Sequence, residues 1–217
     1  MEVVLLIAVL IFSIVVHEVA HAWQARREGD DTAERLGRIT LNPIPHLDFL
    51  GSIMVPMLLW FTHSGFMFGW AKPVPVNPAN YRDHKWGDIR VSLAGIVSNL
   101  GLALLATLFA AVVLKVQSLT GGLGGVTHVL LQMATYGILI NLILAFFNLI
   151  PIPPLDGSHV LFHFLPRPLA LKYREAGRYG LLIVMGLLFF LPGAFNLLLR
   201  PVQWLMGAAD VFIRLWI

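Results

Sequence analysis

Residues 3–25 read VVLLIAVLIFSIVVHEVAHAWQA, a run long enough to cross the roughly 30 Å of hydrocarbon in a bilayer as one helix. This run carries no charge before Glu18. Ionisable side chains are costly at membrane depth, and they mark functional sites by default. The segment therefore predicts both a membrane-spanning helix and a polar site near the end of that helix.

The polar residues of this helix form the motif His17-Glu18-x-x-His21. On a helix, positions i and i+4 share one face, so both imidazoles can bind one metal ion, with Glu18 beside an open coordination position. The spacing predicts a zinc site at which Glu18 acts on a water molecule. An alternative is that the two His residues only form hydrogen bonds with neighbouring helices.

The composition is that of an integral membrane protein, because hydrophobic residues make up 58% of the chain and charged residues only 12%. The chain has no cysteine, so a metal must be bound by His, Asp or Glu. The net charge of +3 comes from loops, as membrane topology requires, and we expect no nucleic-acid partner. Glu2 is atypical of a signal peptide, so we expect the first helix to be retained.

The expected fold class is an all-α polytopic membrane protein forming one domain, residues 1–217. Its catalytic core is predicted at about residues 3–165 and its C-terminal helices at about residues 179–217. A short apolar helix over Pro201–Ile217 carries two charges and is predicted to be interfacial or peripheral. Four stretches are long enough to span the membrane: Val3–Ala25, Val91–Lys115, His128–Ile150 and Tyr179–Leu199.

The segment Leu47–Phe61 is apolar but interrupted by Gly51 and Pro56, which makes it a poor membrane span. A re-entrant loop or membrane-embedded β strands fit the sequence better. Irregular backbone at membrane depth needs protein or water to satisfy its polar groups, so we expect this segment beside a hydrated site. The alternative is an ordinary amphipathic surface loop.

Lys and Arg residues predict the orientation of the chain. They are frequent in residues 24–90 and 166–178, whereas residues 116–127 contain none. By the positive-inside rule, the N-terminus faces outward and the two basic segments face the cytoplasm. The ends of the first and third helices then meet at the cytoplasmic side of the cell's inner membrane, where we expect the active site.

The third predicted helix ends in NLIPIPPLDG, residues 148–157, whose prolines must break the helix and present Asp156 on irregular backbone. Zinc hydrolases commonly combine two His ligands with one carboxylate. Because the topology brings Asp156 back to His17 and His21, we predict it as the third ligand. The alternative is a turn aspartate that precedes glycine.

Asn148 and Asn99 are amides in apolar helices, where each needs a hydrogen-bonding partner. Asn148 can donate to a substrate carbonyl or a developing oxyanion, or it can bond to another helix, and the sequence leaves both open. Asn99 follows Gly95 and small neighbours, which predicts close helix packing with the amide bonded between helices.

On these motifs the chain resembles the site-2 protease family of intramembrane zinc metalloproteases, specifically its small bacterial members without a PDZ or CBS domain. The resemblance covers about residues 10–165. The matching motifs are HEVAH at 17–21, GRITLNPIPHLD at 37–48, GWAKPVPVNP at 69–78, AGIVSN at 94–99 and NLIPIPPLDG at 148–157. Larger family members have a helix before the zinc motif and an appended regulatory domain, neither of which we expect here.

The resemblance implies one Zn²⁺ per chain, bound by His17, His21 and Asp156. It implies that Glu18 is the catalytic base and that Asn148 helps to bind or polarise the scissile peptide. The expected substrates are transmembrane segments of membrane proteins in the lipid bilayer.

The loop containing Asn42 and His46 is broken backbone near the membrane. We predict that both residues contact a metal ligand or the substrate, rather than the metal itself. His159 follows Asp156 by three positions and could also approach the site.

The predicted activity is that of an intramembrane zinc metalloprotease that hydrolyses peptide bonds in or near transmembrane segments. Strand-like parts of residues 40–80 could pair with an unwound substrate. The rival function is a noncatalytic membrane metal-binding protein or a metal transporter. A transporter has no use for a base between its ligands, so Glu18 favours catalysis. The sequence predicts no oligomeric state.

Overall fold

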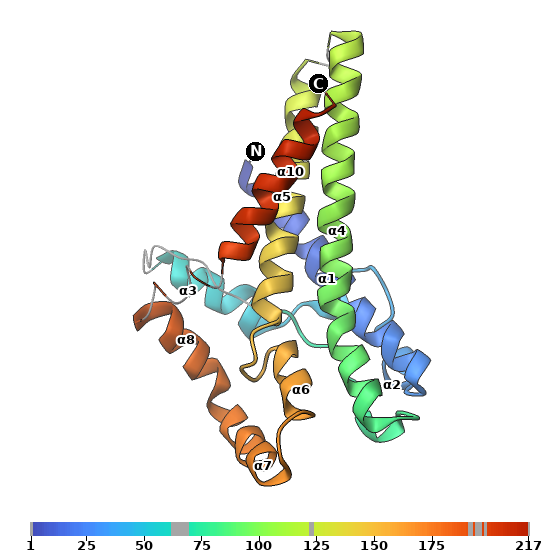
Figure 1. The fold of residues 1–217 in the computed structure, drawn as a ribbon, viewed down its shortest axis with the longest axis vertical. Helices are drawn as coiled ribbons and strands as arrows, with labels where there is room; N and C mark the ends of the chain where they lie inside the picture. The colour runs from blue at the N-terminus through green and yellow to red at the C-terminus, as the bar shows by residue number, and fades with distance from the viewer. Residues whose placement is uncertain are drawn as a thin grey trace.

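The computed structural model describes residues 2–61, 70–121, 124–190, 193, 197 and 199–216, and this part of the chain is helical, with no strand. Figure 1 shows long helices gathered in an elongated bundle, with short helices at one end. The α helices are α1 (Glu2–Glu28), α2 (Thr32–Arg35), α3 (Val55–Phe61), α4 (His84–Thr120), α5 (Gly125–Asn148), α6 (Asp156–Phe162), α7 (Arg167–Ala176), α8 (Gly180–Phe190) and α10 (Arg200–Arg214). The shorter elements are η1 (Ile44–His46), η2 (Phe49–Met54), η3 (Pro78–Asn80) and η4 (Gly177–Tyr179).

Helices α1, α4 and α5 are long and apolar enough to cross a membrane, and each of them packs against the other two. Their ends differ from the predicted spans by a few residues. The largest difference is at the start of α4, where the Asp83 side chain accepts a hydrogen bond from Trp86 N at 3.0 Å and begins the helix before its apolar part. The predicted all-α, multi-pass class is thus confirmed with three candidate spans in the described residues.

The fourth predicted span, Tyr179–Leu199, is described only in part. Helix α8 covers Gly180–Phe190, and most of the rest of the stretch lies outside the described residues. Its membrane crossing therefore stays a prediction.

The C-terminal helix α10 lies lengthwise along α4 and α5 (Figure 1). Its Val202 is buried in a cluster with Ala103 of α4 and Ile138 and Leu142 of α5. Since 15 residues rise only about 22 Å as a helix, α10 is shorter than the hydrocarbon layer. The pairing explains how its apolar face is covered, while its predicted interfacial or peripheral position stays a prediction.

The segment Leu47–Phe61 is helical from Phe49 onward: it forms π-helical turns in η2 that continue into α3. The strand alternative is therefore wrong for these residues. Asp48 begins the helical turns, because its side chain accepts a hydrogen bond from Gly51 N at 2.7 Å and its carbonyl accepts one from Ser52 N at 2.8 Å. The re-entrant membrane position stays a prediction, and Gly69 of the matched motif at 69–78 lies outside the described residues.

Residues 70–77 form an irregular segment that runs from η2 to the end of α1. Backbone hydrogen bonds join Trp70 N to Gly51 O at 3.1 Å and Lys72 N to His46 O at 2.9 Å. Proline follows residues 72, 74 and 77, and a residue before proline favours extended backbone. The segment is thus fixed at both ends without belonging to a sheet.

The second anchor of this segment is Asp30, just after α1. Its carboxylate accepts hydrogen bonds from Asn77 N at 2.6 Å, from the Asn80 side chain at 2.8 Å and from Thr32. Burial alone would raise the pKa of Asp30, but these hydrogen bonds outweigh it and hold the pKa below its ordinary value.

Candidate metal centre

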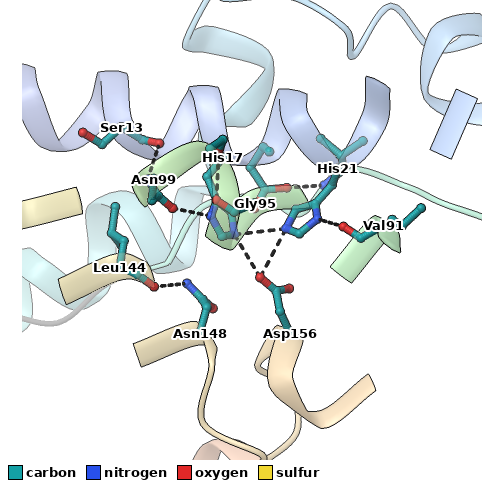
Figure 2. A network of polar contacts seen from close by, with 12 residues as sticks. Ser13, His17, His21, Val91, Gly95, Asn99, Leu144, Asn148 and Asp156 are labelled. Carbon is teal, nitrogen blue, oxygen red and sulfur yellow. Dashed lines mark hydrogen bonds and ion pairs between the residues drawn. The ribbon is translucent and has the colours of Figure 1, made fainter. Parts of the chain in front are cut away.

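Three side chains from two distant parts of the chain converge at one point. The Nε2 atoms of His17 and His21 on α1 lie 3.0 Å apart, and Asp156 Oδ2 lies 3.2 Å from the first and 3.4 Å from the second. Figure 2 shows both imidazoles directed toward this carboxylate, which reaches them from the start of α6. These three side chains, here named the metal-ligating group, are the His, Asp and Glu residues of the described part of the chain that lie close enough together to hold a metal ion.

The hydrogen bonds of the outer ring nitrogens select one tautomer for the neutral form of both imidazoles. His21 Nδ1 lies 2.7 Å from the carbonyl oxygen of Val91, and His17 Nδ1 lies 2.6 Å from Asn99 Oδ1 (Figure 2). Both oxygens are acceptors, so each Nδ1 carries the hydrogen and each neutral ring turns an Nε2 lone pair inward. This is the tautomer that a metal ligand needs.

Three hydrogen-bond acceptors face one another at the centre of the cluster. Two imidazole lone pairs and Asp156 Oδ2, which is buried without a hydrogen-bond partner, point at one another. A shared cation satisfies all three, and two imidazoles with one carboxylate are a donor set that suits zinc.

The local sequence explains why α6 begins at this position. Prolines at 151, 153 and 154 prevent α5 from continuing, and the chain turns back so that Asp156 is the first residue of α6. Gly157 allows the turn to close, because a Cβ on it would collide with the backbone of Leu149. The tight turn thus delivers the carboxylate to α1.

Gly95 on α4 allows the helices to approach at the cluster itself. A Cβ at this position would lie 2.5 Å from His17 Cε1 and 2.5 Å from His21 Nε2. The predicted close packing at Gly95 is therefore confirmed, and the atoms that fill the space are the imidazoles themselves.

Glu18 lies on α1 between the two His residues and is partly buried. Its Oε2 accepts a hydrogen bond from Val74 N at 2.7 Å, in the irregular segment 70–77. The backbone of that segment therefore holds one carboxylate oxygen of the residue predicted to be the base.

Asn148 is the last residue of α5, and Figure 2 shows it on the side of α5 from which the chain leads to Asp156. Its Nδ2 donates to Leu144 O at 3.0 Å, within its own helix. The amide nitrogen has a second hydrogen, so a donor remains for another acceptor.

His46 does not belong to the metal-ligating group. The exposed Asn42 accepts a hydrogen bond from Ile44 N at 3.1 Å and so forms a local turn. His46 is 1% exposed, and its Nε2 lies 3.0 Å from Thr40 O. Both residues shape the loop that supports segment 70–77.

The structure adds residues whose part in the site the sequence did not indicate. Asn99 was predicted as a bond between helices, and its partner is His17 itself. Asn141, an amide inside the apolar α5, bonds to Asn99 at 2.7 Å. The sequence signal that could have identified Asn141 is its polar side chain within an apolar run.

A second polar cluster attaches α6 to α4. Asp88 Oδ2 lies 2.8 Å from His163 Nε2 and 3.5 Å from His159 Nδ1. His159 therefore faces Asp88 and is not part of the metal-ligating group. The cluster holds α6, and with it Asp156, against the helix that packs on α1.

Comparisons with known proteins agree with this geometry. The sequence model of peptidase family M50 matches residues 5–191, which is most of the chain. The chain belongs to peptidase family M50. This is the site-2 protease family that the motifs indicated.

Two relatives of this M50 peptidase bear names that describe zinc metalloproteases. YwhC of Bacillus subtilis (strain 168) is 38% identical over 187 residues, which cover 86% of this chain and 80% of the relative. Rip2 of Mycolicibacterium smegmatis is 32% identical over 192 residues, covering 85% of this chain and 66% of the relative. No solved structure matches the chain at a comparable level.

This M50 peptidase is therefore a zinc metalloprotease with helices suited to crossing a membrane. Zinc is its cofactor, and the His17, His21 and Asp156 group fits that metal by donor type. The expected enzyme class and cofactor are confirmed.

Proposed function

We propose that this M50 peptidase cleaves peptide bonds within or next to the transmembrane segments of membrane-protein substrates. His17, His21 and Asp156 hold the zinc ion in this proposal. The observation that carries it is the convergence of two imidazole nitrogens and one buried carboxylate oxygen in a helix bundle suited to the membrane.

Glu18 is the proposed catalytic base. Zinc, when bound, supplies a water molecule of lowered pKa and polarises the scissile carbonyl. Glu18 takes a proton from the attacking water and returns it to the leaving amide nitrogen. The hydrogen bond from Val74 N supports this role, because it fixes one carboxylate oxygen and leaves the other to accept the proton.

The substrate must be unwound at the cleaved bond, since a helix hides its peptide groups. We propose that the unwound stretch lies along segment 70–77, whose Val74 already contacts Glu18. Pairing with this segment would satisfy substrate amides next to the base. Intact cleavage after substitutions that disrupt such pairing across Pro43–Pro78 would remove this part of the proposal.

Asn148 is the proposed donor to the substrate carbonyl. Its place at the end of α5, eight residues before Asp156, and its remaining amide hydrogen support this role. We propose that Asn42 and His46 support the ligands or the substrate from the loop that holds segment 70–77, since His46 O accepts a hydrogen bond from Lys72 N at 2.9 Å.

The proposed location is the inner membrane of the cell, with the active site toward the cytoplasm. The Lys and Arg residues of segments 24–90 and 166–178 support this orientation. The C-terminal end of α1 and the start of α6, which carries Asp156, lie toward the same end of the molecule as α2 and α7 of these segments (Figure 1).

The test is cleavage of single-span substrates by the purified protein, with zinc content measured in parallel. Glu18→Gln should keep one zinc per chain and lose turnover, because an amide cannot take the proton. Glu175→Gln, an exposed change on α7, is the matched control and should cleave like the wild type. Full turnover by Glu18→Gln would overturn the assignment of the base.

A further inference from the structure

A series of buried amides runs from His17 into the helix bundle. Asn99 on α4 is 0% exposed and Asn141 on α5 is 2% exposed. His17 Nδ1 lies 2.6 Å from Asn99 Oδ1, and Asn99 Nδ2 donates to Asn141 Oδ1 at 2.7 Å. Asn141 Nδ2 in turn donates to Gly137 O at 2.8 Å and to Ser13 Oγ at 2.9 Å.

The direction of this series is set at its far end. The backbone carbonyl of Gly137 can only accept, so Asn141 must turn its nitrogen toward it and its oxygen toward Asn99. Asn99 must then present its nitrogen to Asn141 and its oxygen to His17. Only a hydrogen on His17 Nδ1 satisfies that oxygen, and the Nε2 lone pair is left for the metal.

The opposite orientation of the two amides would place buried acceptors against one another. With Asn141 turned around, its oxygen would face the carbonyl oxygen of Gly137, and two buried acceptors without a donor are costly. Asn99 has one other anchor, Ser13 O, but that contact is long at 3.4 Å. Asn141 is therefore the main group that orients Asn99.

We infer that Asn141 is a positioning residue for the zinc site, which acts through Asn99 to fix the tautomer and orientation of His17. The inference rests on the proposed zinc ligation by His17. It gives α5 a role at the metal besides carrying the chain to Asp156.

Ser13 separates this role from simple helix packing. It is 0% exposed and bonds to the same Asn141 nitrogen. Removing its hydroxyl leaves Gly137 O as an acceptor, so the direction of the amides is kept. If the network served only to join helices, removal of the Ser13 hydroxyl and of the Asn141 amide would weaken zinc binding to a similar extent.

The test measures zinc affinity of the purified full chain by competition with a chelator, together with its thermal unfolding. Asn141→Leu should weaken zinc binding by about 10-fold, within the usual 10–100-fold range for groups that orient a metal ligand. Ser13→Ala should stay within about threefold of the wild type. Thr107→Val is the matched control, because Thr107 is a buried polar residue of α4 whose hydroxyl donates to Ala103 O of the same helix.

Nitrogen-15 NMR of histidine in the zinc-free protein gives a second measurement. The wild type should show His17 with its hydrogen on Nδ1, and Asn141→Leu should show a mixture of the two neutral tautomers. Packing changes alone would not produce such a mixture.

Wild-type affinity and tautomer in Asn141→Leu would overturn the inference and leave the ligands unaffected. Equal losses in Ser13→Ala and Asn141→Leu would overturn it as well, in favour of packing. A wild-type protein that binds no zinc would instead overturn the proposed function, and the inference with it.

Discussion

Gly95→Ala is a severe test of how the helices fit around the metal centre. The added Cβ would lie 2.5 Å from His17 Cε1 and from His21 Nε2, whereas unstrained contacts of this kind need about 3.5–4.0 Å. Either the imidazoles or α4 must therefore move by about 1 Å, while zinc ligation tolerates about 0.2 Å. We expect zinc affinity to fall by about 100-fold and peptide cleavage to be lost.

The assay is zinc competition and substrate cleavage by Gly95→Ala beside Gly101→Ala. Gly101 is on the same helix, and a Cβ there would meet no atom within 4 Å. Alanine is the better helix former by about 1 kcal/mol, so propensity alone predicts that both variants are at least as stable as the wild type. If Gly95→Ala bound zinc and cleaved substrate like Gly101→Ala, the close fit of α4 on the imidazoles would be refuted.

Three further predictions concern the groups around the centre. Val74→Pro removes the N–H that donates to Glu18 Oε2 at 2.7 Å, so kcat should fall about 10-fold. Val74→Ala keeps this N–H and should cleave like the wild type. Equal rates for the two variants would exclude this contact from catalysis. Asp88→Asn should lower the free energy of unfolding by about 1–3 kcal/mol in a denaturation assay, because it weakens the bond to His163 that holds α6; an unchanged value would contradict the attachment. Folding lowers the pKa of Asp30, so the Asp30 carboxylate stabilises the folded protein above its unfolded-state pKa of about 4. This stabilisation is lost as the pH falls from that value through the lower pKa of the folded state. The Tm difference between wild type and Asp30→Asn should therefore shrink on acidification, and a growing difference would be the wrong sign.

The sequence predicted the parts of the site that follow from helix geometry and chain breaks. The i, i+4 spacing of His17 and His21 puts them on one face of α1, and the prolines before Asp156 force the turn that returns it. These are local constraints. The predicted membrane topology adds only that the ends of the first and third helices lie on the same side of the membrane. The metal-ligating group could be named for that reason.

What the sequence could not predict depends on tertiary contacts. Leu47–Phe61 reads as broken backbone, yet Asp48 caps it and the chain forms helical turns instead of strands. Likewise, an amide in an apolar helix indicates that a buried partner exists but not which residue it is. The sequence therefore predicted that Asn99 bonds between helices, but it did not predict the contact with His17. Partner choice depends on helix rotation and register, which hydrophobicity leaves open.

Zinc K-edge X-ray absorption of the purified full chain tests the metal centre most directly. The wild type should show one zinc per chain with imidazole nitrogens at about 2.0–2.1 Å and oxygen ligands at about 2.0–2.2 Å. Asp156→Ala should lose the bound zinc or one oxygen ligand, and His17→Ala should lose imidazole scattering. A wild-type spectrum without imidazole, or one left unchanged by both substitutions, would contradict zinc binding by His17, His21 and Asp156.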